Sequence, residues 1–362
     1  MTSITQILVD RNDFRRTEIA ETPAPALQDG QILVEVEQFG LTANNVTYAV
    51  TGDMIGYWGF FPAEAPWGKV PVWGFARVVD SKSPDIRLGE RIYGYFPMAS
   101  HVVLDVGRAK PQRFTDVAEH RQSLPALYNS YTRCDADPEI LSGLDDARCL
   151  YFPLFATSYV LYDYFIDNDG FGAEQILIGS ASSKTGFGLA FLLHRDPAVK
   201  QKVIGLTSPG NIEFVEKLDI CERVVAYGDV DSAFEPATPT AFVDMSGDGP
   251  LTEKLHMLFQ DNLVESCKVG ATHWETARTT EADLPGAKPK LFFAPAQIGK
   301  RNDEWGPGVM MDRAYKASAD ISKAIKDDIT VRRLQGAEAT ATAWRDTLDN
   351  KIPPSTGLIV TI

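Results

Sequence analysis

The sequence lacks the patterns that mark several classes of protein. Its four cysteines are scattered without a C-x-x-C pair, so we expect neither a zinc knot nor a disulfide framework. Lys and Arg form no run, and the net charge is −14, which argues against a nucleic-acid partner. Neither a secretion signal nor an apolar run of about 18 residues is present. We therefore expect a cytoplasmic protein with small-molecule ligands and without nucleic-acid or membrane partners.

The chain has enough apolar sequence for a large core. Of its 362 residues 44% are apolar, and 22 Pro with 28 Gly are too few for a disordered or collagen-like chain. At about 100–200 residues per domain, the length predicts two domains.

The texture of the sequence changes near residues 135–155. Residues 30–104 predict short strands, of which Gln31–Gln38 alternates apolar and polar side chains. From Leu150 onward, apolar runs such as Gln175–Ile178 alternate with helical stretches, which is typical of a parallel sheet covered on both faces. Near the end, residues 338–348 have helical spacing, and the apolar tail GLIVTI (residues 357–362) requires a sheet to bury it. The predicted fold class is α/β.

The segment Gln175–His194, QILIGSASSKTGFGLAFLLH, runs from an apolar strand through a small-residue loop into an apolar helix. Such a turn presents backbone N–H groups at a helix N-terminus, where a diphosphate is favoured. The loop departs from the pattern G-x-G-x-x-G, since Ser180, Ser183 and Gly186 occupy the three spaced positions. A tight β–α turn of any doubly wound domain is the alternative interpretation.

Charged and hydroxyl side chains in this loop favour the phosphate-binding interpretation. An ammonium group at Lys184 would pair with a phosphate, and the serine and threonine hydroxyls are further donors. The predicted phosphate-binding residues are Ser180, Ser183, Lys184, Thr185 and Gly186.

The next apolar run ends in Thr207 and Ser208. NAD-selective domains have an Asp or Glu near this place to bind the ribose hydroxyls, and none is present here. Hydroxyl donors without a carboxylate tolerate a 2′-phosphate, so we expect NADP rather than NAD. Alternatively, either residue caps the helix that begins near Asn211.

With these residues in view, the chain resembles the medium-chain dehydrogenase/reductase superfamily, in its zinc-independent, quinone-oxidoreductase-like branch. The similar segments cover nearly the whole chain and include GQILVEVEQFGLTANNVTYAVTGD (residues 30–53), PVWGFARVVDS, IRLGERIYGY, LFATSYVLYDYF, SASSKTGFG, VIGLTS, DMSG (residues 244–247) and VESCKVGATHW. The phrase LFFAPAQIGKR with EWG (residues 291–306) resembles one subfamily of that branch.

The resemblance implies two domains and a cofactor. A GroES-like substrate domain would comprise residues 1–145 and 335–362, and a Rossmann nucleotide-binding domain residues 146–334, with NADPH in the cleft. We add three residues to the expected cofactor site, Thr157, Tyr227 and Phe292.

Zinc-dependent members of the superfamily carry a catalytic Cys and a Gly-His-Glu. At the corresponding places this chain has Asn44-Asn45 and Trp73-Gly74-Phe75. Since a catalytic zinc needs three N, S or O ligands, we predict no metal.

Without a metal, reduction of a conjugated carbonyl needs donors to the developing enolate oxygen. Tyr48 is similar in place to a tyrosine of quinone reductases, and Asn44 or Asn45 would add amide donors. The alternative is that the asparagines form a turn and that Tyr48 is a core residue.

Two further groups of residues leave alternatives open. Aromatic residues are concentrated in residues 57–73. They would form a substrate pocket for a cyclic or aryl compound, part of the core, or a lid. Lys300 and Arg301 would either bind a substrate carboxylate or face water, and we favour water. Among the histidines, only His273 is placed to approach the cofactor.

We therefore predict an NADPH-dependent oxidoreductase that reduces an enone or quinone by hydride transfer. Two alternatives are a redox-neutral lyase or isomerase that uses bound NADP(H), and a non-catalytic NADPH-binding protein. A homodimer formed through the edges of the nucleotide-domain sheets is a further expectation.

Overall fold

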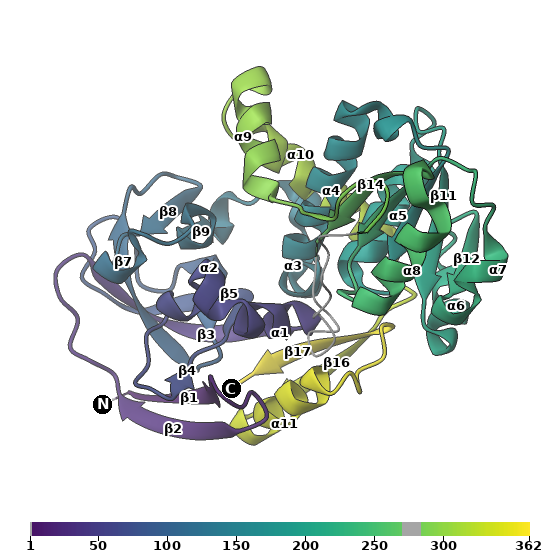
Figure 1. The fold of residues 1–362 in the computed structure, drawn as a ribbon. Helices are drawn as coiled ribbons and strands as arrows, with labels where there is room; N and C mark the ends of the chain where they lie inside the picture. The colour runs from purple at the N-terminus through teal and green to yellow at the C-terminus, as the bar shows by residue number, and fades with distance from the viewer. Residues whose placement is uncertain (1, 270–283) are drawn as a thin grey trace. The chain divides into compact units, whose positions relative to one another are not determined.

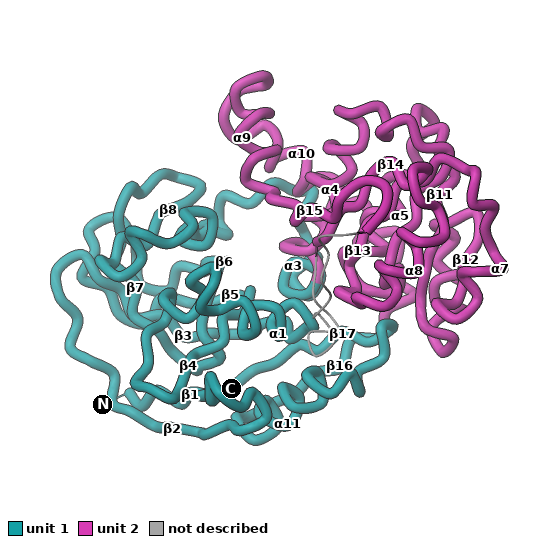
Figure 2. Tube along the Cα trace, viewed as in Figure 1, with its two compact units in different colours: residues 1–150, 330–362 teal, residues 151–329 magenta. Residues whose placement is uncertain are grey.

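The computed structural model describes residues 2–269 and 284–362, which divide into two compact units. Unit 1 comprises residues 1–150 and 330–362, and unit 2 comprises residues 151–329 (Figure 2). Unit 1 therefore contains both ends of the chain, and each unit is described separately.

Unit 1 is built mainly from strands (Figure 1). Its strands are β1 (Ser3–Asp10), β2 (Thr17–Pro23), β3 (Gln31–Leu41), β4 (Trp67–Gly68), β5 (Pro71–Ser81), β6 (Arg91–Pro97), β7 (His101–Gly107), β8 (Arg113–Asp116), β9 (Ser130–Arg133), β16 (Thr330–Gln335) and β17 (Thr356–Thr361). The main sheet has the order β16-β17-β3-β5-β6-β9-β8-β7, and β7 pairs again with β3. This second pairing closes the strands from β3 to β7 into a barrel. Strands β2, β1 and β4 form a smaller sheet.

The helices of unit 1 are α1 (Ala43–Val50), α2 (Gly52–Ile55), α3 (Asp145–Leu150) and α11 (Ala337–Leu348). Helix α11 confirms the helix predicted from the spacing of residues 338–348. The apolar tail becomes β17, which pairs with β3 through Leu358 and Leu41 and is buried from Gly357 to Val360. The sheet that this tail was expected to require is therefore present.

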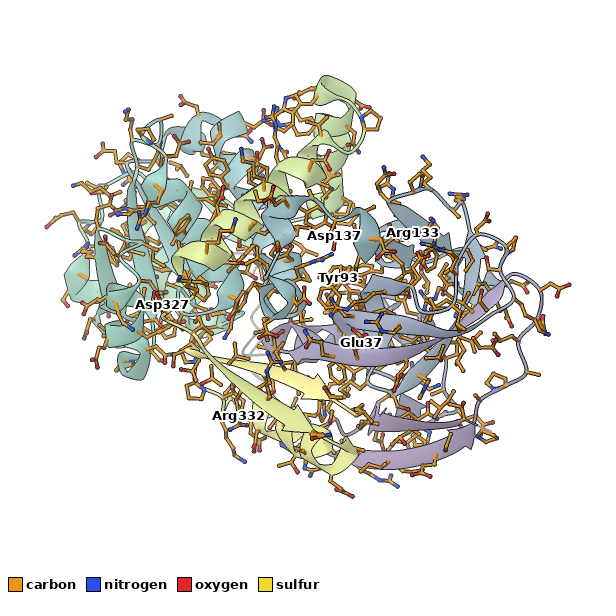
Figure 3. All side chains as sticks on the ribbon, turned by 180° about the vertical axis from the view of Figure 1, so that it is seen from behind. Glu37, Tyr93, Arg133, Asp137, Asp327 and Arg332 are labelled. Atoms are coloured by element: carbon orange, nitrogen blue, oxygen red, sulfur yellow. The ribbon has the colours of Figure 1, made fainter. Side chains whose placement is uncertain are left out.

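Arg148 fastens α3 to the barrel. The hydroxyl of Tyr93 donates to the backbone oxygen of Arg148 at 2.9 Å, and the Arg148 guanidinium pairs with Asp137 at 2.5 Å (Figure 3). The same guanidinium lies over the rings of Phe75 and Tyr93, at 4.9 and 4.5 Å from their centroids. These contacts fix the last residues of unit 1 before the chain enters unit 2.

Unit 2 is a parallel sheet with helices between its strands. Its strands are β10 (Gln175–Gly179), β11 (Lys202–Thr207), β12 (Arg223–Ala226), β13 (Thr240–Asp244), β14 (Leu263–Lys268) and β15 (Lys290–Leu291). Its helices are α4 (Phe152–Asp167), α5 (Lys184–Arg195), α6 (Ile212–Lys217), α7 (Val230–Ala233), α8 (Gly249–Phe259), α9 (Ala294–Trp305) and α10 (Val309–Ala324).

The strand order in unit 2 is β12-β11-β10-β13-β14-β15, and every pairing is parallel. Numbered within the unit, this is the 3-2-1-4-5-6 order of a doubly wound dinucleotide-binding domain. All residues of β10 and β13 are buried, as expected for strands covered on both faces. The α/β fold class, with a β-rich unit and a Rossmann unit, is confirmed.

The core of unit 2 lies against this sheet. Leu177, Phe242 and Leu255 belong to one buried cluster and are fully inaccessible. Burial of each such side chain contributes about 1.5–3 kcal/mol, which holds the carboxyl ends of the central strands in place. Within the described residues, no helix is both long enough and apolar enough to cross a membrane.

Candidate functional site

The loop after β10 turns sharply into α5. Ser180 has a positive φ of 54°, and the hydroxyl of Ser183 caps the helix by accepting from the backbone N–H of Gly186 at 3.1 Å. A Cβ at Gly186 would lie 2.4 Å from the backbone oxygen of Ser180. Only glycine permits this close approach, so the loop is a cradle at the N-terminus of α5.

Lys184 is the first residue of α5 and is half-buried. Burial lowers the pKa of its ammonium group to about 8. At pH 7 most molecules therefore still have a charged Lys184. It lies at the N-terminus of α5, where the helix dipole also attracts anions. The expected grouping of Lys184 with Ser183 and Gly186 in one turn is what the structure has.

Tyr227 lies beside the same loop. Its phenol oxygen accepts a hydrogen bond from the backbone N–H of Ser180 at 3.0 Å. Burial raises the pKa of Tyr227 to about 12, so the phenol is neutral. Two predicted cofactor residues are thus in contact, but the Ser180 N–H is already bonded within the protein.

Hydroxyl groups gather at the carboxyl end of β11. Ser182 Oγ accepts from the hydroxyl of Thr207 at 3.1 Å and from Nδ2 of Asn211 at 3.2 Å. Asn211 Nδ2 also donates to Oγ of Ser208 at 3.0 Å. No side-chain capping bond is made by Ser208 at the short helical turn Pro209–Asn211. Ser182 is one of the loop serines whose hydroxyls were expected as donors, whereas Asn211 was missing from the predicted site.

Asp244 at the end of β13 also escaped the sequence prediction. One of its carboxylate oxygens accepts from the backbone N–H and the hydroxyl of Ser246, at 2.8 and 2.5 Å, and from the N–H of Gly247 at 3.0 Å. Burial raises the pKa of Asp244 against the effect of these bonds. Gly179 pairs with Asp244 across the two central strands, so the turn 244–247 lies beside the α5 loop at the switch point of the sheet.

Thr157 and Phe292 lie on other parts of unit 2. The Thr157 hydroxyl donates to the backbone oxygen of Pro153, one turn earlier in α4, at 3.1 Å. Phe292 follows β15 and packs against Tyr164 of α4, with ring centroids 5.4 Å apart. Both side chains therefore contact other parts of unit 2: Thr157 bonds the backbone of its own helix, and Phe292 packs on a ring of α4.

Lys300 and Arg301 fasten α9 to α4. Lys300 pairs with Asp167, and Arg301 Nε donates to Asp163 at 2.7 Å. Gln297 also donates to Asp163, at 2.6 Å. The preferred expectation that both cations face water is wrong for Arg301, which is buried, because the carboxylates of α4 compensate its charge.

In unit 1, Tyr48 is buried on α1. Its phenol oxygen accepts a hydrogen bond from Nε1 of Trp73 on β5 at 3.0 Å. The Trp73 bond and the nearby Asn44 side chain both favour the phenolate. Burial nevertheless raises the pKa of Tyr48 well above its ordinary value, so the phenol is a neutral donor. Two predicted catalytic residues, Asn44 and Tyr48, are therefore together.

Asn45 has a different place. Its side-chain oxygen accepts from the backbone N–H of Thr42 at 2.7 Å, and its amide donates to the backbone oxygen of Pro71 at 2.8 Å. These bonds form a capping box at the start of α1 and tie it to β5. The side chain thus has a structural function within helix α1, rather than in the turn that was the alternative expectation.

An aromatic cluster surrounds Tyr48. It consists of Tyr48, Tyr57, Phe60, Phe61, Trp73, Tyr95 and Tyr128. Five of these come from the aromatic-rich segment of the sequence or from the helix of Tyr48, but Tyr95 on β6 and Tyr128 in the turn Ala126–Asn129 were not foreseen. They are distant in sequence, and only the barrel brings them to α1.

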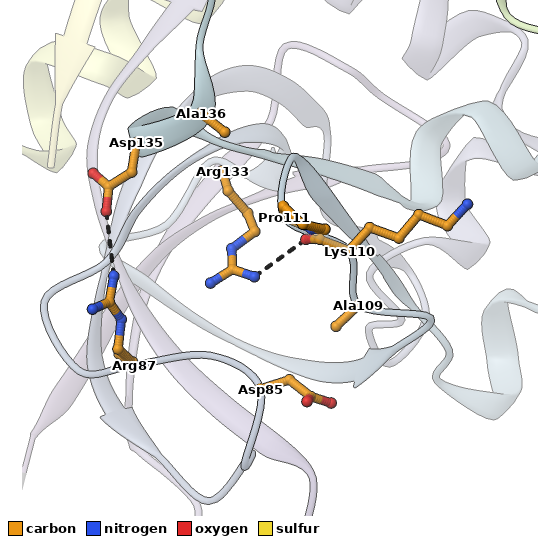
Figure 4. Close-up of a pocket in the computed structure, with 8 residues that line it drawn as sticks. All are labelled: Asp85, Arg87, Ala109, Lys110, Pro111, Arg133, Asp135 and Ala136. Atoms are coloured by element: carbon orange, nitrogen blue, oxygen red, sulfur yellow. Dashed lines mark hydrogen bonds and ion pairs between the residues drawn. The ribbon is translucent and has the colours of Figure 1, made fainter.

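The surface pocket of unit 1 is elsewhere. It has a volume of about 530 Å³ and is lined by Asp85, Arg87, Ala109, Lys110, Pro111, Arg133, Asp135 and Ala136 (Figure 4). Arg133 pairs with Glu90 at 2.5 Å, and Arg87 pairs with Asp135 at 3.6 Å. Its arginines are thus already paired with carboxylates, and none of the predicted site residues lines it.

Metal ligands and His273 complete the predicted set. Within residues 2–269 and 284–362, no three His, Cys, Asp or Glu side chains are grouped as metal ligands. His273 lies outside the described residues.

Comparison with models of protein families identifies the family of this chain. The family model described as "Protein of unknown function (DUF2855)" matches residues 39–353. The chain belongs to this family. A search of curated proteins found none that matches.

Solved structures resemble this chain along its whole length. The CurA protein of Vibrio vulnificus in complex with NADPH has a TM-score of 0.62 at 12% identity, over 99% of this chain and 98% of that one. The YhdH oxidoreductase of Salmonella enterica in complex with NADP has a TM-score of 0.54 at 12% identity, over 99% of both chains. A mutant enoyl thioester reductase of Candida tropicalis has a TM-score of 0.57 at 10% identity, over 100% of both chains. This DUF2855 protein therefore has the same fold as these solved structures.

Proposed function

We propose that this protein is an NADPH-dependent oxidoreductase. The observation that carries the proposal is the cradle at the N-terminus of α5. Gly186 leaves no room for a side chain beside Ser180, and the charged end of Lys184 belongs to the same turn. The cradle lies at the switch point of a 3-2-1-4-5-6 sheet, where dinucleotides bind in this class of domain.

The residues present fit the phosphates of such a cofactor. Lys184 and the backbone of Thr185 and Gly186 would hold the diphosphate, as a cation and N–H donors do at a helix N-terminus. The relatives CurA and YhdH were solved with NADPH and NADP, which supports this choice of ligand for the same fold.

The end of β11 supports NADP over NAD. Thr207 and Ser208 provide hydroxyls there, joined through Ser182 and Asn211. An NAD-selective site would place a carboxylate here for the ribose hydroxyls, whereas neutral donors accept a 2′-phosphate without charge repulsion.

We further propose that the substrate is a conjugated carbonyl compound, such as an enone or quinone, reduced without a metal. NADPH supplies a hydride when it is bound. Tyr48 would donate its phenol proton in a hydrogen bond to the carbonyl oxygen, where negative charge develops. Nε1 of Trp73 donates to the phenol oxygen, which holds the hydroxyl in place and makes it a stronger donor. The rings around Tyr48 would exclude water from a planar, apolar substrate.

Cofactor binding and turnover test the proposal. Titration of the fluorescence of the six tryptophans should show tighter binding of NADPH than of NADH. Incubation with enones, quinones and aldehydes should then consume NADPH in a one-to-one ratio with one of them. Substrate loss at constant NADPH absorbance would instead indicate a redox-neutral reaction. Binding without any turnover would indicate a nucleotide-binding protein, and absence of binding would refute the proposal.

A further inference from the structure

The aromatic cluster of unit 1 has more phenol donors than acceptors. The hydroxyls of Tyr57 and Tyr128 hydrogen-bond to each other at 2.9 Å. The oxygen of Tyr48 accepts from Trp73, and the hydroxyl of Tyr95 has no partner in the part of the chain that the structure describes. Hydrogen bonds among these four tyrosines therefore use one phenol proton, the one shared by Tyr57 and Tyr128.

The pair formed by Tyr57 and Tyr128 acts as a single polarised donor. Whichever hydroxyl donates to the other, one proton of the pair remains available. Tyr57 is 7% exposed and Tyr128 is half-buried in the turn Ala126–Asn129, and burial raises the pKa of both phenols. A hydroxyl that accepts one hydrogen bond becomes a stronger donor of the next.

The rings of Tyr48, Tyr57 and Tyr128 contact one another. The Tyr57 ring lies between the other two, with centroids 4.6 Å from Tyr48 and 5.4 Å from Tyr128, and the Tyr48 and Tyr128 centroids are 6.2 Å apart. A negative charge on Tyr48 would raise the pKa of Tyr128, which indicates that the two oxygens are near each other. Burial keeps both phenols neutral, as donors must be.

We propose that Tyr48 and Tyr128, with Tyr57 behind Tyr128, form a two-phenol oxyanion hole. The substrate oxygen would then accept two O–H bonds rather than one. This inference rests on the proposed function, because hydride addition is the step that puts negative charge on that oxygen. A site with surplus donors and aromatic walls selects a planar carbonyl compound, whose oxygen only accepts, over an alcohol, whose hydroxyl needs an acceptor of its own.

The test uses 4-nitrophenol, a planar phenol whose anion is coloured, as an oxyanion probe in the absence of cofactor. The full-length protein should bind the anion in preference to the neutral form, which lowers the apparent pKa of the bound probe. Tyr57→Phe and Tyr128→Phe should each weaken anion binding about tenfold, the value of one neutral hydrogen bond. Tyr162→Phe is the control, because its hydroxyl bonds Asp196 in unit 2 and does not belong to the cluster, so the affinity should stay unchanged.

Turnover gives a second readout. In single-turnover hydride transfer to the substrate found above, Tyr128→Phe should lower the rate about 10²–10³-fold, as loss of one oxyanion-hole donor does, with unchanged NADPH affinity. Parental probe affinity in both Tyr57→Phe and Tyr128→Phe would overturn the inference and leave Tyr48 as the one donor. Because the probe needs no cofactor, failure to bind NADPH would refute the proposed function alone.

Discussion

Nε1 of Trp73 donates a hydrogen bond to the phenol oxygen of Tyr48 at 3.0 Å. The bond joins β5 to α1 and occupies one acceptor position of the phenol. Because the phenol oxygen accepts this bond, its own proton is left for a hydrogen bond to another acceptor. The relationship explains how a core tyrosine can remain a donor for a ligand.

Removal of Tyr48 or Trp73 should lower the rate of turnover without changing the affinity for the cofactor. Tyr48→Phe should lower turnover about 10²–10³-fold. Trp73→Phe should lower it about tenfold, because a single neutral hydrogen bond to the phenol is lost. In the Tyr48→Phe background, Trp73→Phe should have no further effect on turnover, since its acceptor is gone. NADPH affinity is the control and should stay at the parental value throughout. Additive losses in the double variant would contradict a role of Trp73 through Tyr48.

The pKa of Lys184 predicts a pH dependence of cofactor affinity. Its value of about 8 means that the ammonium is charged below pH 8 and loses its charge as the pH rises. The dissociation constants of NADPH and NADH should both increase between pH 7 and pH 9, because the diphosphate is common to the two. Lys184→Met should weaken both about 10- to 100-fold and remove this pH dependence. A loss of affinity for NADPH alone would indicate that Lys184 binds the 2′-phosphate instead of the diphosphate.

Gly186 and Gly299 form a matched pair of helix glycines. Gly186→Ala would place a Cβ 2.4 Å from the Ser180 backbone oxygen, whereas nothing lies within 4 Å of a Cβ at Gly299 in α9. Overpacking at position 186 should destabilise unit 2 by about 1–3 kcal/mol and weaken NADPH binding. Gly299→Ala should stabilise it by about 0.5–1 kcal/mol through helix propensity. Urea unfolding and NADPH titration measure both effects, and equal stability of the two variants would contradict the tight loop.

Hydroxyls at the end of β11 should set the preference for NADPH. Thr207→Val combined with Ser208→Ala removes two of them and should reduce NADPH affinity about tenfold, with NADH affinity unchanged. Ser232→Ala is the control, because its hydroxyl is exposed and bonds only the backbone of Asp229. If the double variant binds the two cofactors as the parent does, this edge does not recognise the 2′-phosphate.

Tyr95 and Tyr131 should respond to loss of a hydroxyl with opposite signs. The buried Tyr95 hydroxyl has no hydrogen-bond partner in the described structure, so Tyr95→Phe should stabilise the protein by about 1 kcal/mol. The Tyr131 hydroxyl donates to the backbone oxygen of Tyr95 at 2.6 Å and accepts from Arg121 at 3.1 Å. Tyr131→Phe should therefore destabilise the protein by about 1–3 kcal/mol. Urea midpoints decide, and destabilisation by Tyr95→Phe would indicate a partner for its hydroxyl.

Local patterns were sufficient for much of the cofactor half of the site. The strand, the small-residue loop and the helix at residues 175–194 are contiguous, so their periodicity predicts the turn that contains Ser183, Lys184 and Gly186. Asp244 was harder to identify, because its hydrogen bonds depend on how the turn after β13 folds back. Asn45 illustrates the opposite error, since its polar side chain is used to cap a helix.

Periodicity and loop composition along the chain were enough to predict a β-rich half, a parallel-sheet half and a buried C-terminal strand, because strand and helix patterns are local. Tertiary structure decided which side chains meet around Tyr48. Trp73, Tyr95 and Tyr128 lie 25, 47 and 80 positions further along the chain. Trp73 and Tyr95 are neighbours only because β5 pairs with β6 in the sheet that also contains β3. No spacing rule relates residues on different strands, since their proximity depends on the register of the whole sheet.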